Sequence, residues 1–156
     1  MVKLSIALAT YNEAANLASC LDSVATWTNE IVVVDGSSTD QTVAIAKKYG
    51  ARIIVTDNPP IFHINKQKAV EACRGDWILQ LDADEVVTPE LVREIKSEIR
   101  NQKSEYNGYY FPRKNFFLGH WLRKGGQYPD YVIRLFRKGK GWFPQKSVHE
   151  QIVVDG

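Results

Sequence analysis

The first hundred residues alternate between two hydrophobic patterns. Short apolar runs occupy residues 4–9, 31–34, 53–55 and 77–81, and each is followed by a more polar stretch. Apolar runs of this length are typical of strands that are covered on both faces. Strands that alternate with helices predict an α/β fold, with a mostly parallel sheet and helices on both of its faces.

The polar stretches carry apolar residues at helical spacing. This spacing predicts three helices, over residues 14–24, 43–49 and 63–73. Thr39 or Asp40 is expected to cap the second of them. Thr88, followed by Pro89, is expected to start a fourth helix, because proline is favoured at the first helical position.

The remaining chain is less regular. Residues 108–112 and 131–136 are expected to be strands, and residues 148–154 are a further candidate. We expect the 156 residues to form one domain, because this length supports a single core.

The two parts of the chain differ in charge. Residues 1–106 contain 11 Lys and Arg against 15 Asp and Glu, a net charge of −4, whereas residues 107–156 contain 9 against 3, a net charge of +6. The second part also holds 11 of the 17 aromatic residues. The domain is therefore expected to have two halves with different tasks.

Composition narrows the class of protein. Hydrophobic residues make up 44% and charged residues 24%, as in ordinary globular proteins. Cys20 and Cys73 match no metal or redox spacing and are expected to be buried, reduced thiols. No apolar run approaches the roughly 18 residues that span a bilayer, and no signal-peptide pattern begins the chain. We expect a cytoplasmic location.

Polar clusters follow three of the predicted strands. They are residues 10–13, 35–40 and 82–85, and each contains a carboxylate. Such residues are common in turns. In open α/β sheets, however, ligands bind beyond the carboxyl ends of the strands, so three clusters at this edge indicate a crevice for a polar ligand.

Asp82 and Asp84 give the crevice its chemistry. If the chain stays extended, side chains two residues apart point the same way. Two such carboxylates repel each other unless a cation or a donor lies between them. Mg²⁺ or Mn²⁺ bound to phosphate oxygens would meet this requirement. The alternative is that Asp84 and Glu85 start a turn before the next helix.

The order of these blocks resembles the family 2 glycosyltransferases. The matching residues are Thr10-Tyr11-Asn12-Glu13, then Asp35-Gly36-Ser37-Ser38, then Leu81-Asp82-Ala83-Asp84-Glu85. The resemblance implies the GT-A fold, a Rossmann-like arrangement, and transfer of a sugar from a nucleotide diphosphate, with a UDP-sugar expected. Arg134-Leu135-Phe136-Arg137 and Val148-His149-Glu150 resemble the branch with lipopolysaccharide-core glucosyltransferases, whose members usually extend beyond residue 156.

The resemblance also assigns roles to residues. Asp82, Ala83 and Asp84 match the Asp-x-Asp motif. In the family, this motif contacts the metal, the pyrophosphate and the ribose of the donor. Asp35 matches the carboxylate that hydrogen-bonds the nucleobase. The loop that lines the base and ribose matches three further residues, Thr10, Tyr11 and Glu13. The chain departs from many members after Asp35, where Gly36 and Ser37 replace an aspartate and a glycine.

Two lysines precede the strand predicted over residues 77–81, which leads to Asp82. Lys66 and Lys68 lie in the helix predicted over residues 63–73, where lysines are ordinarily solvated. One of them is expected to neutralise the diphosphate, as a compact cation can. Lys68 is the predicted residue, because the resemblance places this region over the donor.

The second half is expected to face the acceptor. Residues 115–124 form an aromatic stretch with a basic end, which is typical of a loop that covers the core. It could also contact a glycan or lipid-linked acceptor, or the inner face of a membrane. Nucleic acid is not expected, since no RNA-binding signature is present and the first half is acidic.

Transfer also needs a general base. Two carboxylates are candidates, Asp130 after Pro129 and Glu150 beside His149. Glu150 stands in an apolar run, where desolvation raises the pKa of a carboxylate toward the working pH. The resemblance favours Glu150 and implies direct displacement with inversion at the anomeric carbon.

Two other classes of function fit parts of the pattern. A sugar nucleotidyltransferase would have a glycine-rich loop after the first strand, and residues 9–13 contain no glycine. A non-catalytic module that only binds the donor is the other alternative, because the chain ends at residue 156 where related proteins continue.

Overall fold

The computed structural model of the chain describes residues 1–59, 62–113, 116–117, 120–121, 130–144 and 151–156. A six-stranded sheet forms its centre, with the order β3-β2-β1-β4-β8-β5. Its strands are β1 (Leu4–Thr10), β2 (Glu30–Asp35), β3 (Arg52–Val55), β4 (Trp77–Gln80), β5 (Gly108–Arg113) and β8 (Asp130–Arg137).

Most neighbouring strands of this sheet are parallel. The first four strands pair in parallel, and β8 pairs antiparallel with both β4 and β5. Among the described residues, four short strands lie outside this sheet: β6 (Phe116–Phe117), β7 (His120–Trp121), β9 (Gly141–Trp142) and β10 (Val153–Val154). The predicted mostly parallel α/β sheet is therefore confirmed.

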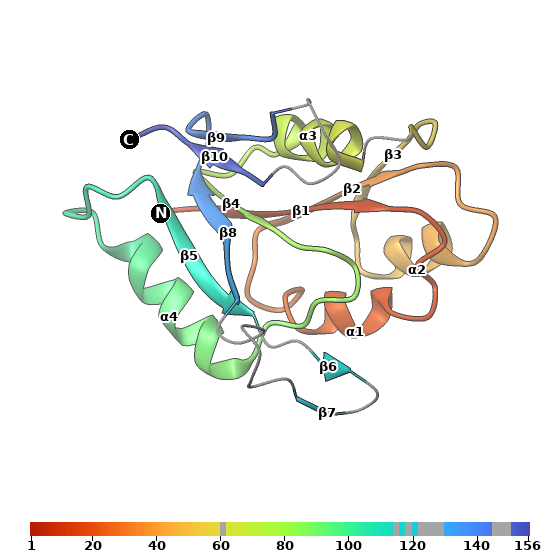
Figure 1. Ribbon diagram of the computed structural model, residues 1–156, viewed down its shortest axis with the longest axis horizontal. Coiled ribbons are helices and arrows are strands. Elements are labelled where there is room, and N and C mark those ends of the chain that lie inside the picture. The colour runs from red at the N-terminus through yellow and green to blue at the C-terminus, as the bar shows by residue number, and fades with distance from the viewer. Residues whose placement is uncertain (60–61, 114–115, 118–119, 122–129, 145–150) are drawn as a thin grey trace.

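Helices cover both faces of the sheet (Figure 1). One face carries α1 (Leu17–Asp22), α2 (Thr42–Lys48) and α4 (Pro89–Arg100), and the other carries α3 (Phe62–Ala72). Each face has its own apolar core, with Leu8, Leu21 and Ile95 in the first and Val34, Val70 and Phe136 in the second. Burial of alternate residues on opposite faces fixes the register of the strands.

Several boundaries differ from those expected. The first helix begins at Leu17 and has only six residues, and the second begins at Thr42. Gln41, and not Asp40, occupies the N-cap position of the second helix. The Asp40 carboxylate instead accepts hydrogen bonds from the backbone N–H and the hydroxyl of Thr42. The cap at Thr88 is confirmed, since its Oγ1 accepts a bond from the Leu91 N–H at 3.3 Å.

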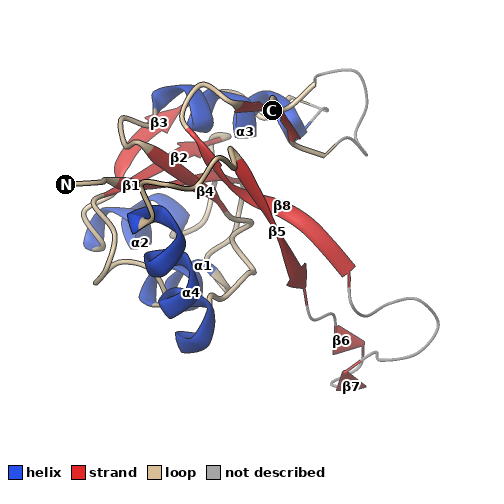
Figure 2. Ribbon diagram, turned by 90° about the vertical axis from the view of Figure 1, so that its left-hand side faces the viewer, coloured by secondary structure: helices blue, strands red, loops and turns tan. Residues whose placement is uncertain are grey.

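Strands β5 and β8 form a ribbon that extends beyond the helices (Figure 2). Inside the sheet, β8 lies directly beside β4, with Leu135 opposite Leu79. This pairing brings the basic second half of the chain against the strand that precedes Asp82. Of the expected strand over residues 148–154, residues 148–150 lie outside the described part; within residues 151–154 the strand comprises Val153–Val154.

Candidate functional site

Strands β1 and β2 end side by side. Thr10 pairs with Asp35 at the last position of each strand, and both side chains are buried. The Thr10 hydroxyl donates a hydrogen bond of 2.7 Å to Asp35 Oδ1. Ser38 donates to the same carboxylate twice, from its hydroxyl to Oδ1 at 2.7 Å and from its backbone N–H to Oδ2 at 2.8 Å.

The loops that follow these strands are joined to each other. Asn12 donates its N–H to the Ser38 hydroxyl at 2.8 Å and accepts the Thr39 N–H at 2.8 Å. The Glu13 N–H donates to Thr42 Oγ1 at 2.8 Å. Asn12 and Ser37 have φ values of 51° and 63°. Such left-handed backbone is uncommon outside glycine, so this network holds two loops in a conformation that costs energy.

The third cluster does not continue as a strand. Strand β4 ends at Gln80, and a turn follows, in which the Glu85 N–H donates to the Asp82 carbonyl at 2.9 Å. The Glu85 side chain closes this turn, because its Oε1 accepts a hydrogen bond from the Asp82 N–H at 2.7 Å. Residues 82–85 are called the Asp82 turn below. The chain therefore does not stay extended through Asp84, and the two carboxylates differ in their surroundings: Asp82 is half-buried, whereas Asp84 is exposed.

Two protein cations contact Asp82. The Lys66 ammonium lies 2.9 Å from Oδ1, and the Arg134 guanidinium lies 3.4 Å from Oδ2. Arg134 also contacts Glu85, with its Nε 3.2 Å from Oε1. Burial alone would raise the pKa of the Asp82 carboxyl, but the charges of Lys66 and Arg134 outweigh burial and hold that pKa below its usual value.

Cys20 lies beneath the same cluster. Its thiol is 3.7 Å from the Asp82 carbonyl oxygen. Burial, together with the negative charges of Glu85, Asp82, Asp84 and Glu13, raises the pKa of Cys20 to about 12. Carboxylates from the loops after β1 and β4 are thus close enough together to raise the pKa of the same thiol. Both cysteines are buried and free, as expected from the sequence.

The two lysines of α3 reach different strand ends. Lys66 contacts Asp82 after β4, whereas the exposed Lys68 donates to Thr56 Oγ1 at 3.2 Å, just after β3. Of the other predicted residues, Tyr11 is exposed, Glu13 is partly buried and Ala83 is buried. For Asp130 the structure gives the backbone, at the start of β8, and Glu150 lies outside the described residues.

The sequence analysis assigned Arg134 no role at the site. The sequence does offer a clue to this role, since Arg134 stands between Ile133 and Leu135 inside a predicted strand. A charge that is buried in a strand requires a partner of opposite charge. The partners, Asp82 and Glu85, are about fifty positions earlier in the chain, and only the pairing of β8 with β4 brings them together.

The donor set is compatible with a divalent metal. Asp82 and Asp84 offer only oxygen ligands, which suit Mg²⁺ and Mn²⁺. Within the described residues, no group of three His, Cys, Asp or Glu side chains could by itself hold a metal ion. A metal bound here would therefore need further oxygens from water or from a phosphate, which is the usual mode for Mg²⁺ in phosphate-binding sites.

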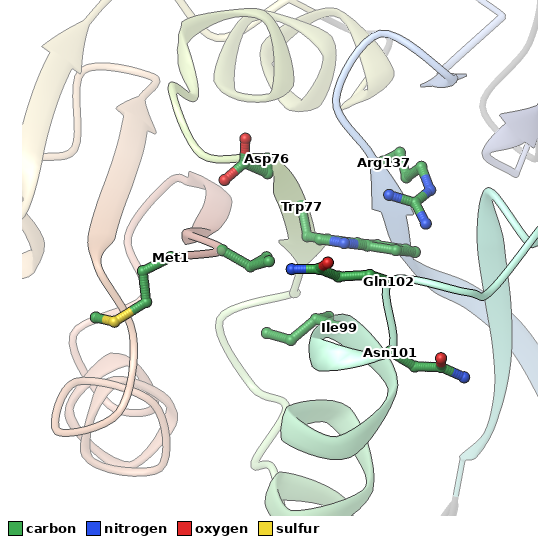
Figure 3. A pocket seen from close by; sticks show the side chains of 8 residues that line it. Met1, Asp76, Trp77, Ile99, Asn101, Gln102 and Arg137 are labelled. Carbon is green, nitrogen blue, oxygen red and sulfur yellow. The ribbon is translucent and has the colours of Figure 1, made fainter.

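A surface hollow lies at the other end of the strands. It has a volume of about 400 Å³ and is lined by residues that include Met1, Asp76, Trp77 and Arg137 (Figure 3). The Arg137 guanidinium stacks 4.5 Å from the Trp77 ring centre and donates to two backbone carbonyls. The described lining of this hollow contains none of the candidate residues, which lie at the carboxyl ends of the strands.

Solved structures of similar shape support the fold. The crystal structure of S. aureus TarS has a TM-score of 0.67 at 21% identity and covers 92% of this chain and 31% of its own. The M. tuberculosis glucosyl-3-phosphoglycerate synthase has a TM-score of 0.55 at 24% identity, over 65% of this chain and 42% of its own. The fold is that of the GT-A glycosyltransferases.

Sequence relatives point to the same class. An uncharacterized glycosyltransferase of Rickettsia typhi is 42% identical over 99% of this chain and 54% of its own length. The lipopolysaccharide core biosynthesis glycosyltransferase LpsC of Rhizobium meliloti is 34% identical over 98% of this chain and 58% of its own. The chain thus spans about half the length of these curated relatives. The sequence model of "Glycosyl transferase family 2" matches residues 5–148, and the chain belongs to this family.

Proposed function

We propose that the chain transfers a sugar from a nucleotide diphosphate donor, with UDP as the nucleotide, to a hydroxyl of a glycan or lipid-linked acceptor. The observation that carries the proposal is the meeting of Thr10, Asp35 and the Asp82 turn at one edge of the sheet. In this arrangement, the loops after β1 and β2 bind the base and ribose. The Asp82 turn faces the diphosphate.

The relatives support the donor and the metal. TarS has also been solved in complex with UDP, with a TM-score of 0.60 to this chain. The mannosyltransferase PcManGT from Pyrobaculum calidifontis, with a TM-score of 0.57, was solved with GDP-Man and Mn²⁺. LpsC supports an acceptor in the lipopolysaccharide core.

The chemistry required at the site is a displacement at the anomeric carbon. The bond from this carbon to the diphosphate oxygen breaks, and a bond to the acceptor oxygen forms with inversion. The hydroxyl proton passes to a carboxylate, for which Glu150 is proposed and Asp130 is the alternative. Asp84 and Asp82 would hold Mg²⁺ or Mn²⁺, which when bound supplies Lewis-acid stabilisation of the leaving diphosphate.

A peripheral contact with the membrane is a further part of the proposal. The net charge of +6 on residues 107–156 would favour an anionic surface at the inner face of the membrane. Among the described helices, none is both long and apolar enough to cross a bilayer. Vesicle binding that weakens as salt rises would support the contact, whereas no binding to anionic vesicles at low ionic strength would contradict it.

A panel of nucleotide sugars tests the proposed function. Thermal unfolding is followed with each donor, in the presence of Mn²⁺ and of EDTA. One UDP-sugar should raise the midpoint only with Mn²⁺, because binding to the native state stabilises it. No shift with any nucleotide sugar would contradict the proposal. A shift without release of UDP in the presence of a glycan acceptor would favour a module that only binds the donor.

A further inference from the structure

Each carboxylate oxygen of Asp82 has its own protein cation. Lys66 lies 2.9 Å from Oδ1 and Arg134 lies 3.4 Å from Oδ2. The three side chains come from α3, from β8 and from the turn after β4. They are partly buried, with exposed fractions of 20% for Lys66, 11% for Arg134 and 31% for Asp82. In the free protein, Asp82 therefore already has its charge compensated.

The two cations are held in different ways. Arg134 makes two further contacts with Glu85, from Nε at 3.2 Å and from a terminal nitrogen at 3.4 Å. Its planar guanidinium is thus fixed between two carboxylates. Lys66 has a flexible four-carbon stem, and among the described residues its ammonium forms an ion pair with Asp82 alone. Lys66 is therefore the cation that can change partner.

An aromatic ring supports Lys66 in its resting position. The ammonium lies 5.8 Å from the centre of the Phe143 ring, a cation–π distance. Phe143 is buried, and its N–H donates to Gln67 Oε1 at 2.7 Å, so the ring is attached to the same helix as Lys66. This contact helps to hold the ammonium near Asp82.

A metal at Asp82 would change this balance. A divalent cation and the Lys66 ammonium would share one carboxylate, and like charges a few ångströms apart repel. A diphosphate beside them supplies negative oxygens that attract the ammonium. We propose that Lys66 is an exchangeable counter-ion: it pairs with Asp82 in the free protein and moves to the donor diphosphate when metal and nucleotide bind. This inference rests on the proposed function.

If Lys66 exchanges partners in this way, its removal should change the affinities for Mn²⁺ and for UDP in opposite directions. Lys66→Met removes the competing charge, so Mn²⁺ alone should bind about threefold or more tightly than to the unchanged chain. The same variant loses a charge-assisted contact to the diphosphate, so UDP in the presence of Mn²⁺ should bind about tenfold more weakly. Lys66→Arg keeps the charge and should retain most of the affinity for UDP.

Two binding measurements test the exchange. Free Mn²⁺ is followed by electron paramagnetic resonance, and UDP binding at saturating Mn²⁺ is followed by calorimetry. Lys48→Met is the matched control, because Lys48 is exposed in the last turn of α2 and the substitution makes the same change in net charge. Opposite changes in Lys66→Met, with Lys48→Met like the unchanged chain, would support the exchange.

Other outcomes overturn it. If Lys66→Met weakens the binding of Mn²⁺ alone, Lys66 orders the metal site and does not compete for Asp82. If UDP affinity is unchanged, the ammonium never reaches the diphosphate. Either result would leave the proposed function intact, provided that the unchanged chain binds UDP with Mn²⁺. Failure of the unchanged chain to bind UDP would overturn both.

Discussion

The Thr10 hydroxyl donates a hydrogen bond of 2.7 Å to Oδ1 of Asp35, and both side chains are buried at the ends of adjacent parallel strands. Together with two donors from Ser38, this bond satisfies a carboxylate that would otherwise be costly to bury. Asp35 therefore orders the loops after β1 and β2, and contact with a nucleobase would be an additional role.

Asp35→Ala separates the structural role of Asp35 in the loops from its proposed contact with the nucleobase. Removal of the carboxylate leaves the buried Thr10 hydroxyl and the Ser38 donors without their acceptor, so stability should fall by about 1–3 kcal/mol. UDP binding should weaken about tenfold if Asp35 also contacts the base. Urea unfolding and calorimetry measure the two effects. An unchanged UDP affinity in Asp35→Ala would refute base recognition.

Asp84→Ala should act on binding alone. Asp84 is exposed, so its loss should change stability by less than about 0.5 kcal/mol. As the more accessible metal ligand of the proposal, it should be required for the dependence of UDP binding on Mn²⁺. Calorimetry in Mn²⁺ and in EDTA checks this. Glu94→Ala, at an exposed position of α4, removes the same charge elsewhere. Equal UDP affinity in Mn²⁺ and EDTA for the unchanged chain would contradict the metal role.

Arg134→Gln should remove a pH-dependent part of the stability. Burial opposes ionisation of Asp82, but Lys66 and Arg134 hold its pKa below the usual value, so the ionised form favours folding. This contribution is present above the unfolded pKa of about 4 and is lost as pH falls through the lower folded pKa.

Urea unfolding at several pH values measures that contribution. At pH 7 the Arg134→Gln variant should be less stable by about 1–3 kcal/mol, because two half-buried carboxylates lose a partner. Below pH 4 the difference from the unchanged chain should narrow. A difference that stays constant from pH 7 to pH 3 would show that packing of the long side chain is responsible.

The two cysteines should be inert in the folded protein. Burial raises the pKa of Cys20 and of Cys73 to about 12, so both remain thiols at neutral pH. Alkylation by iodoacetamide at pH 8, followed by mass spectrometry, should therefore be slow, and should become complete in urea. Rapid labelling of Cys20 without denaturant would show that the Asp82 turn opens in solution.

Glu150→Gln tests the proposed base. The variant should keep metal-dependent binding of the donor, while the rate of sugar transfer falls by about two orders of magnitude or more, as for loss of a general base. Asp130→Asn should cost less. Release of UDP in the presence of an acceptor used by the unchanged chain measures transfer. Near-normal transfer by Glu150→Gln would move the role to Asp130 or to a residue outside this chain.

The sequence by itself determined that the sheet is mostly parallel, and at which edge the polar clusters lie. Apolar runs such as residues 31–34 form strands, because a run that is apolar at every position is stable only when both faces are covered. Strands that alternate with helices must run mostly in parallel, so their polar ends meet at one edge. Residues 10–13, 35–40 and 82–85 lie at this edge as predicted.

Only the tertiary structure decided how the charges at that edge are compensated. Arg134 is 52 positions from Asp82, and the antiparallel pairing of β8 with β4 sets which side chains meet. The turn from Asp82 to Glu85 likewise depends on a side chain that accepts a backbone N–H, which strand propensity does not encode. Spacing along a chain reports local geometry, whereas an ion pair depends on the register between strands that are distant in sequence.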